Sequence, residues 1–101
     1  MKFNHFAYIF LGHDFDPAKD RTTIKTAKTT FTTVGISFHE KERVIEIAKE
    51  MIADGAQMIE LCGGFGPIWI AKILEATNFQ VPVGGVAYGP EARKPLMDLL
   101  T

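Results

Sequence analysis

The chain has 101 residues, of which 47% are hydrophobic and 23% are charged, a composition typical of one globular domain and not of a disordered segment. The formal net charge is −1 and no stripe of Lys or Arg is present, so the electrostatic signature of binding to nucleic acid or to an anionic membrane is missing. A single cysteine excludes an internal disulfide and favours a reducing compartment, so we expect one cytoplasmic domain spanning residues 1–101.

Two strands with a long connection between them are predicted in the N-terminal third. Residues 3–11 are rich in aromatic and β-branched side chains, as buried strands are, and Gly12 ends the run. This run is too short to cross a membrane, and its flanks do not resemble a signal sequence. Residues 12–30 are polar and contain Pro17, so we expect a long connection with room for one short element, whose path as a hairpin or a crossover stays open. Residues 31–36 form the second predicted strand.

A helix is predicted to begin at Ser37, which lies three residues before Glu40 in a capping-box pattern. Most charged positions fall on one side of this helix, and Gly55 provides the stop. The apolar positions that share its inner face are Val44, Ala48, Met51 and Ile52.

The C-terminal half continues the alternation of strand and helix. Residues 57–62 and 81–87 predict strands, and residues 67–77 predict a helix between them. Pro90 can begin a last helix but Pro95 would interrupt it, so two short turns or a kinked helix are expected. This alternation is typical of βαβ units, whose crossovers make strands parallel. The predicted fold is α/β: a small, mainly parallel four-stranded sheet with helices packed on it, in the order β-loop-β-α-β-α-β-α.

The segment Leu-Cys-Gly-Gly-Phe-Gly-Pro, residues 61–67, is the most informative in the chain because it joins a predicted strand to a predicted helix. Its glycines permit unusual φ angles and close approach of a ligand, and the start of a helix favours an anion. The third glycine of the dinucleotide fingerprint and the Gly-Lys-Ser/Thr ending of a P-loop are absent, so no nucleotide is assigned. At the carboxyl edge of a parallel sheet, the candidate ligand-binding residues are Gly63, Gly64, Phe65, Gly66, His13 and Tyr88.

Cys62 and Glu60 are the candidate catalytic residues, and they share one face of a strand because they lie two residues apart. Cys62 precedes a helix start, where it could act as a nucleophile or as an acid/base; the alternative is a small buried apolar side chain. Glu60 could serve as a general base if it were buried; a structural hydrogen bond or a place at the rim of the site are the alternatives.

No cofactor or metal is expected. His5, His13 and His39, with the neighbouring acids, lack the spacing of zinc or calcium ligands. His13 is the best placed of the three because the predicted strand ends just before it. His5 is expected to pack within that strand, and His39 to be solvated.

The predicted helix of residues 67–77 is apolar nearly all round, with Lys72 and Glu75 as its only charges. Its core face is complete without Ile68 and Trp69, and an aromatic side chain in such a place is a frequent interface anchor. We therefore expect a homo-oligomer, a dimer being the simplest form, that associates through Ile68 and Trp69. The alternative is that Trp69 covers the core of its own chain.

In residues 3–11, 29–35, 59–67 and 81–84 the chain resembles a family of small single-domain α/β proteins that is classed as a domain of unknown function. The resemblance spans nearly the whole chain and is most specific from Glu60 to Gly66. It implies the fold and the importance of this turn, but it carries no activity and no catalytic residue.

Three functions stay open. The first is a small-molecule binding module, an oligomer that holds a carboxylate or phosphate of a small anionic metabolite at the glycine-rich turn. The second is a small enzyme in which Cys62 or Glu60 exchanges a proton with such a ligand or attacks it. The third is a structural or protein-interaction domain that uses the surface around Ile68 and Trp69. In that last case the glycines only permit a tight strand-to-helix connection.

Overall fold

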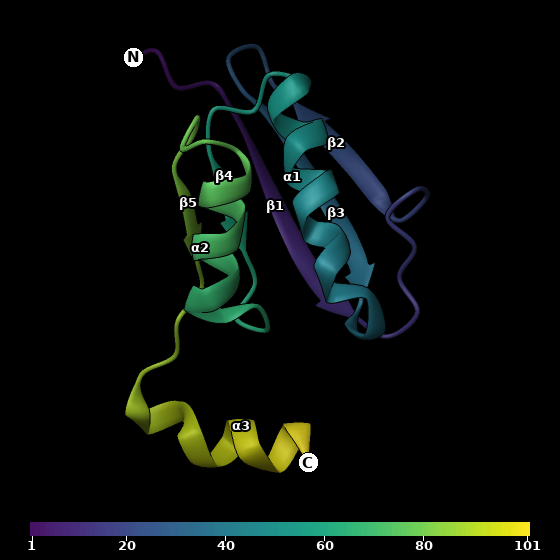
Figure 1. Cartoon of the computed structure of the whole chain (residues 1–101), viewed down its shortest axis with the longest axis vertical. Helices are drawn as coiled ribbons and strands as arrows, with labels where there is room; N and C mark the ends of the chain where they lie inside the picture. The colour runs from purple at the N-terminus through teal and green to yellow at the C-terminus, as the bar shows by residue number, and fades with distance from the viewer.

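The sheet has five strands in the order β2-β3-β1-β4-β5 and forms the centre of the computed structural model, which describes all 101 residues (Figure 1). Four strands are parallel to one another: β1 (His5–Gly12), β3 (Thr30–Ser37), β4 (Ile59–Leu61) and β5 (Val83–Gly85). β1 and β3 pair along their whole length. The predicted α/β fold with a mainly parallel sheet is therefore confirmed.

The predicted count of four strands is one too few, because the connection of residues 12–30 contains β2 (Arg21–Lys25). β2 is antiparallel to β3 and joins it through a tight turn, in which Thr26 Oγ1 accepts hydrogen bonds from two N–H groups at 3.2 and 3.0 Å. The connection between β1 and β3 is therefore a crossover, because these two strands are parallel, and only its last part forms a hairpin with β3. The prediction treats this segment as a loop because its threonines are polar. Threonine is also β-branched, and such side chains are favoured in an exposed edge strand.

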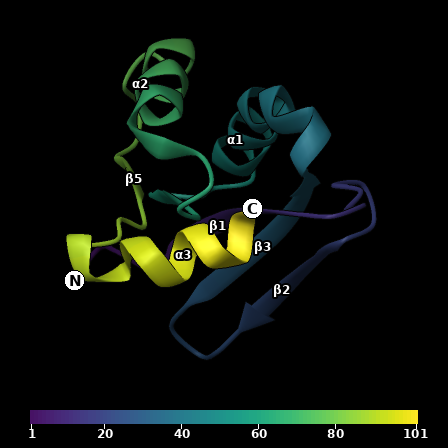
Figure 2. The same ribbon diagram turned by 90° about the horizontal axis from the view of Figure 1, so that it is seen from below.

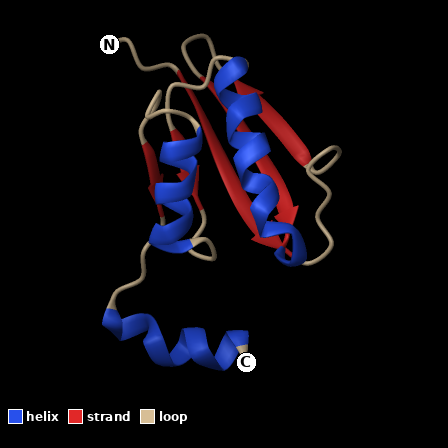
Figure 3. Ribbon diagram, viewed as in Figure 1, coloured by secondary structure: helices blue, strands red, loops and turns tan.

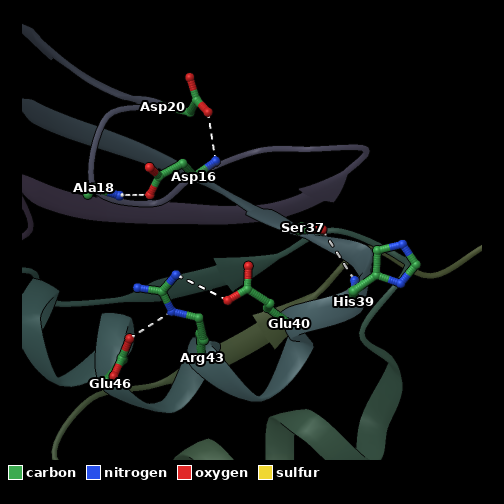
Figure 4. A network of polar contacts seen from close by, with 8 residues as sticks. All are labelled: Asp16, Ala18, Asp20, Ser37, His39, Glu40, Arg43 and Glu46. Atoms are coloured by element: carbon green, nitrogen blue, oxygen red, sulfur yellow. Dashed lines mark hydrogen bonds and ion pairs between the residues drawn. The ribbon is translucent and has the colours of Figure 1, made fainter.

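The first helix begins later than predicted. A 3-10 turn, η1 (Phe38–Arg43), follows β3, and Ser37 Oγ accepts a hydrogen bond from one N–H of this turn at 3.4 Å (Figure 4). Glu40 does not complete the capping box, because its carboxylate pairs with Arg43 at 3.4 Å. The regular helix α1 (Val44–Ala53) starts only after the turn.

The end of α1 agrees with the prediction, since Gly55 has a φ of +108°, which glycine adopts without strain. The N–H groups of Gly55 and Ala56 donate to the carbonyls of Ile52 and Met51 at 3.0 and 2.9 Å, which is the pattern of a Schellman motif. Ile52 is only half-buried. The fully buried face of α1 consists of Val44, Ile47, Ala48 and Met51.

The C-terminal half contains α2 (Gly66–Ala76), the 3-10 turn η2 (Pro90–Ala92) and α3 (Arg93–Leu100). Pro95 does not kink α3, because it lies in the first turn, where its missing N–H breaks no helical hydrogen bond. No residue of α3 is buried, and Figure 3 shows α3 beyond the ends of the strands. None of the helices has the length and apolar character needed to cross a membrane.

α1 and α2 lie on the same side of the strands, and no helix lies over the other side (Figure 2). The hydrophobic core fills the space between the sheet and these two helices; it includes Ala7 and Ile9 of β1 and Ile73 of α2. Strand side chains alternate between faces, so the other set points away from the helices. We call this uncovered side the open face; its strand residues are Thr22, Ile24, Phe31, Thr33, Gly35, Phe6, Tyr8, Phe10, Glu60 and Gly84.

Candidate functional site

The carboxyl ends of the parallel strands meet at one edge of the sheet, as predicted. β1, β4 and β5 end shortly before His13, Cys62 and Tyr88, respectively. The last two segments are in contact, because a Cβ added to Gly63 would lie 2.7 Å from the ring of Tyr88. Candidate residues from distant parts of the sequence therefore gather at this edge.

A cavity of about 270 Å³ lies between this edge and α3. Cys62, Gly63, Gly64 and Tyr88 form one side of it. The rest of its lining is apolar and consists of Leu11, Phe38, Leu96, Leu99 and Leu100. Its volume is just below the roughly 300–1,000 Å³ that ligand pockets commonly have. The cavity therefore suits a small molecule with an apolar part and one polar end.

The predicted binding residues of the turn do not all face this cavity. Phe65 is only 5% exposed and belongs to the hydrophobic core. Gly66 lines a separate hollow of about 220 Å³, together with Pro67. Gly66 is also the one residue of the turn with a positive φ, +79°. Thus Gly63 and Gly64 face the cavity, whereas Phe65 and Gly66 build the connection between β4 and α2.

Side chains crowd Gly64, and a positive charge lies beside it. A Cβ on Gly64 would be 3.1 Å from Leu11 Cδ1 and 3.6 Å from Cys62 Sγ. Lys41, in η1, donates from Nζ to the carbonyl of Gly64 at 3.0 Å. α2 begins without a side-chain cap, so the N–H groups of its first turn have no side-chain partner. A fixed cation and a helix start both favour a negative group near this turn.

The two candidate catalytic residues differ in their surroundings: Glu60 belongs to β4, whereas Cys62 follows its last residue. Cys62 is half-buried, and its Sγ accepts a hydrogen bond from the N–H of Leu11 at 3.3 Å. Glu60 is exposed on the open face and has no ion pair or hydrogen bond. It therefore lacks the buried environment that a general base of the proposed kind requires.

Tyr8, on the open face, is close enough to Cys62 and Glu60 for their charges to affect its pKa. Burial raises the pKa of its hydroxyl, and the negative charges that Cys62, Tyr88 and Glu60 carry when ionised raise it further. The pKa of Tyr8 thus moves further above neutral pH, and the residue presents a protonated hydroxyl on the open face.

His13 lies next to the cavity but does not line it. Its ring is edge-on to that of Phe38, with the centroids 5.0 Å apart. His13 and Phe38 form a second hollow of about 360 Å³ with Leu99 and Leu100. Phe38 and these two leucines line both hollows. His13 therefore contacts residues of the cavity wall without lining the cavity itself. No three His, Cys, Asp or Glu side chains lie close enough together to hold a metal ion.

The apolar wall of the cavity is the part that sequence reasoning misses. Leu96, Leu99 and Leu100 have the i, i+3, i+4 spacing of an amphipathic helix, so the sequence does carry a signal for them. Phe38 and Lys41 belong to a 3-10 turn, and only the tertiary structure brings them to the residues after β4.

Trp69 is half-buried and packs against the hydrophobic core of its own chain. Lys72 Nζ lies 4.4 Å from the centroid of its ring, a cation–π contact. Ile68 is 69% exposed. Trp69 and Ile68 are the pair predicted from the sequence to form a dimer contact. Of the two, only Ile68 has a side chain that is mostly exposed to solvent.

Comparison with known proteins agrees with the predicted resemblance to a domain of unknown function. The model of the Family of unknown function (DUF6506) matches residues 4–101. No curated protein matches the chain, and no solved structure does so either.

Proposed function

The chain belongs to the DUF6506 family, to which no function is assigned, and we propose that it binds a small molecule carrying a carboxylate or a phosphate in the cavity beside Cys62, Gly63 and Gly64. The observation that carries the proposal is the makeup of this cavity. Backbone of the glycine-rich turn and the hydroxyl-bearing Tyr88 lie on one side, and leucines lie on the other. A few polar groups in an otherwise apolar cavity are typical of metabolite sites.

The polar end of the ligand is assigned to the turn. The ammonium group of Lys41 has three N–H donors, and its hydrogen bond to the carbonyl of Gly64 uses one of them. The others can reach an anion placed over Gly63 and Gly64. Hydrogen bonds between charged groups are roughly twice as strong as neutral ones, so Lys41 supplies selectivity for an anion.

The apolar part of the ligand is assigned to α3. Leu99 is 79% exposed and Leu100 is 67% exposed, and both line the cavity. Covering apolar surface contributes about 25 cal/mol per Å². An apolar group between these leucines and Tyr88 would therefore strengthen binding and hold α3 against the sheet edge, since no residue of α3 is buried in the free protein.

A thermal-shift screen tests this proposal. Matched pairs of small carboxylates and phosphates, with and without an apolar group, are added to the purified protein. A ligand at a hundred times its dissociation constant stabilises the folded state by about 2.7 kcal/mol, which for a chain of this size raises Tm by on the order of 10 °C. We expect the members that carry both an anion and an apolar group to give the largest shifts.

Gly64→Val places methyl groups toward Leu11 and Cys62 and should abolish the shift. The matched control is Gly84→Val, because a Cβ on Gly84 meets no atom within 4 Å. Lys41→Met should weaken binding of the anionic members and spare their neutral analogues. Shifts that survive in a folded Gly64→Val variant would place the ligand elsewhere, and the absence of any shift across the library would refute the binding role.

The second candidate, an enzyme that uses Cys62, is favoured by one observation: the thiol lies in the wall of the cavity with its Sγ held by the Leu11 N–H. No side chain that could act as its base is hydrogen-bonded to it. Alkylation with iodoacetamide separates the two functions. Fast modification of Cys62 at neutral pH and loss of turnover in Cys62→Ser indicate an enzyme, whereas slow modification and unchanged ligand affinity in Cys62→Ser indicate binding alone.

A further inference from the structure

The open face of the sheet carries Phe6, Tyr8, Phe10, Phe31 and Ile24 although no helix covers it (Figure 2). Directly opposed residues of neighbouring strands share a face, which places Phe6, Phe31 and Ile24 in one row across β1, β3 and β2. Tyr8 and Phe10 follow along β1. Among the strand residues of the open face, Glu60 is the only one with a charge.

Aromatic rings on this face form two packed groups. Phe6 lies between Phe3 and Phe31, with ring centroids 5.5 and 4.7 Å apart. In the second group, Phe10 contacts Tyr8 at 6.3 Å and Phe15 at 5.0 Å. Such pairs lie within the range at which aromatic rings attract one another, so the surface is preformed.

This pattern is the one expected for strands that are buried on both sides. Parallel sheets occur almost only where both faces are covered, and their central strands are apolar at nearly every position. β1 meets this description, because Ala7 and Ile9 are buried under the helices while Phe6, Tyr8 and Phe10 occupy the alternate positions. Within one copy of the chain, no helix covers the second set (Figure 2).

We propose that a second copy of this chain covers the open face, so that two sheets pack face to face in a symmetric dimer. Two features point to a second copy. Apart from Glu60 on β4, the strand residues of this face carry no charge and give little repulsion between two copies, whereas an anionic polymer or membrane would need a basic surface. Its size also fits, as shown by the spacing of the strands.

The area available agrees with what a dimer needs. β1 and β3 have eight residues each, which corresponds to a length of roughly 26 Å, and five strands about 4.8 Å apart give a width of roughly 20 Å. Allowing for the shorter outer strands, the flat area is on the order of 400 Å². An area of this order on each partner corresponds to the smaller specific interfaces, which bury less than about 1,200 Å² in total.

Analytical ultracentrifugation tests the proposal. The wild-type protein at tens of micromolar should sediment with twice its chain mass of 11.2 kDa. Ile24→Lys should shift it to the monomer, raising the dissociation constant by roughly 100-fold or more, because each copy would bury an unpaired ammonium group in the interface. Ile24 is 57% exposed within one copy, so the variant should keep its circular dichroism spectrum.

Ile68→Lys is the matched control, since Ile68 is an isoleucine of similar exposure on α2. It should leave the dimer intact. Tyr8→Lys, at the centre of the open face, provides a second disrupting variant. A monomeric wild-type protein would overturn the proposal. So would a dimer that Ile68→Lys dissociates and Ile24→Lys does not, a result that would instead support association through the surface around Ile68 and Trp69.

Discussion

The two faces of the sheet are built by the same strands but have different side chains and different surroundings. On the covered face, β1 contributes Ala7 and Ile9, which are fully buried beneath the helices. On the open face, the same strand contributes Phe6, Tyr8 and Phe10, which are all half-buried. The larger apolar side chains are thus the less buried ones. Along β1, the burial of a side chain therefore depends on whether α1 and α2 cover its face of the sheet, and not on the hydrophobicity of the residue.

The covered face also carries the polar contacts that fasten the sheet to its helices. Arg21 of β2 forms a bidentate ion pair with Glu50 of α1, with N–O distances of 2.5 and 3.2 Å. On the open face, Glu60 has no such partner. The covered face is therefore closed by contacts within one chain, whereas no helix and no ion pair closes the open face (Figure 2).

The largest expected effect comes from comparing the two faces by truncation. Ile9→Ala leaves a cavity beneath the helices and should lower the free energy of unfolding by about 2–5 kcal/mol. Ile24→Ala removes an exposed side chain and should change it by less than ~0.5 kcal/mol in a monomer. Urea unfolding measures both. If the open face is a dimer contact, the cost of Ile24→Ala grows with protein concentration, and equal costs at all concentrations would contradict that contact.

An intermediate effect is expected where a ring packs on a glycine. A Cβ on Gly12 would overlap the ring of Phe15, which also covers Gly35 on the open face. Gly12→Ala should therefore displace this ring and destabilise the fold by about 1–3 kcal/mol. Gly84→Ala, where a Cβ meets nothing within 4 Å in one copy of the chain, is the control and should be neutral at low protein concentration, where the chain is monomeric. A Gly12→Ala variant as stable as Gly84→Ala would show that Phe15 does not rest on the strands in solution.

The smallest effect concerns the ion pair between Arg21 and Glu50. Hydrogen bonding to the Arg21 guanidinium lowers the pKa of the Glu50 carboxyl. The resulting stabilisation is present above the unfolded pKa, about 4.3, and is lost as the pH falls through the lower folded pKa. Both side chains are partly exposed, so Arg21→Met should cost no more than about 1 kcal/mol at neutral pH.

The difference in the free energy of unfolding between wild type and Arg21→Met should shrink in acid, where Glu50 is protonated. Chemical denaturation at a series of pH values measures it. Lys94→Met removes the exposed pair with Asp98 on α3 and serves as the control, with little effect at any pH. A deficit of Arg21→Met that is unchanged in acid would mean that Arg21 acts through its other contacts, such as the hydrogen bond that its Nε donates to the carbonyl of Pro17 at 2.7 Å.

Much of the fold follows from local signals in the sequence. The apolar run before Gly12, the stop at Gly55 and the alternation of strands with helices predict the parallel strands and the edge at which Cys62 and Tyr88 meet. β2 is not predicted because most of its residues are exposed to solvent, so the strand lacks an alternating apolar pattern. The late start of α1 escapes it too, since the pairing of Glu40 with Arg43 competes with the capping box.

The candidate site is predictable only in part. Gly63 and Gly64 face the cavity as expected, but Phe65 turns into the core and Gly66 lines another hollow. Alternation along a strand does not extend through a turn, so the sequence cannot say which way each residue of the turn points. The leucines of α3 show an amphipathic pattern without showing what they pack against.

By itself, the sequence determined which side chains share a face, because strand and helix periods are local properties of the backbone. It also indicated that β3, β4 and β5 are parallel, since a helix between two strands leaves enough chain for a crossover, whereas it left the direction of β1 relative to β3 open. Only the tertiary structure decided that α1 and α2 lie on one side of the sheet and that α3 meets the turn after β4. Those choices depend on contacts between residues far apart in the chain, and such contacts leave no periodic trace in the sequence.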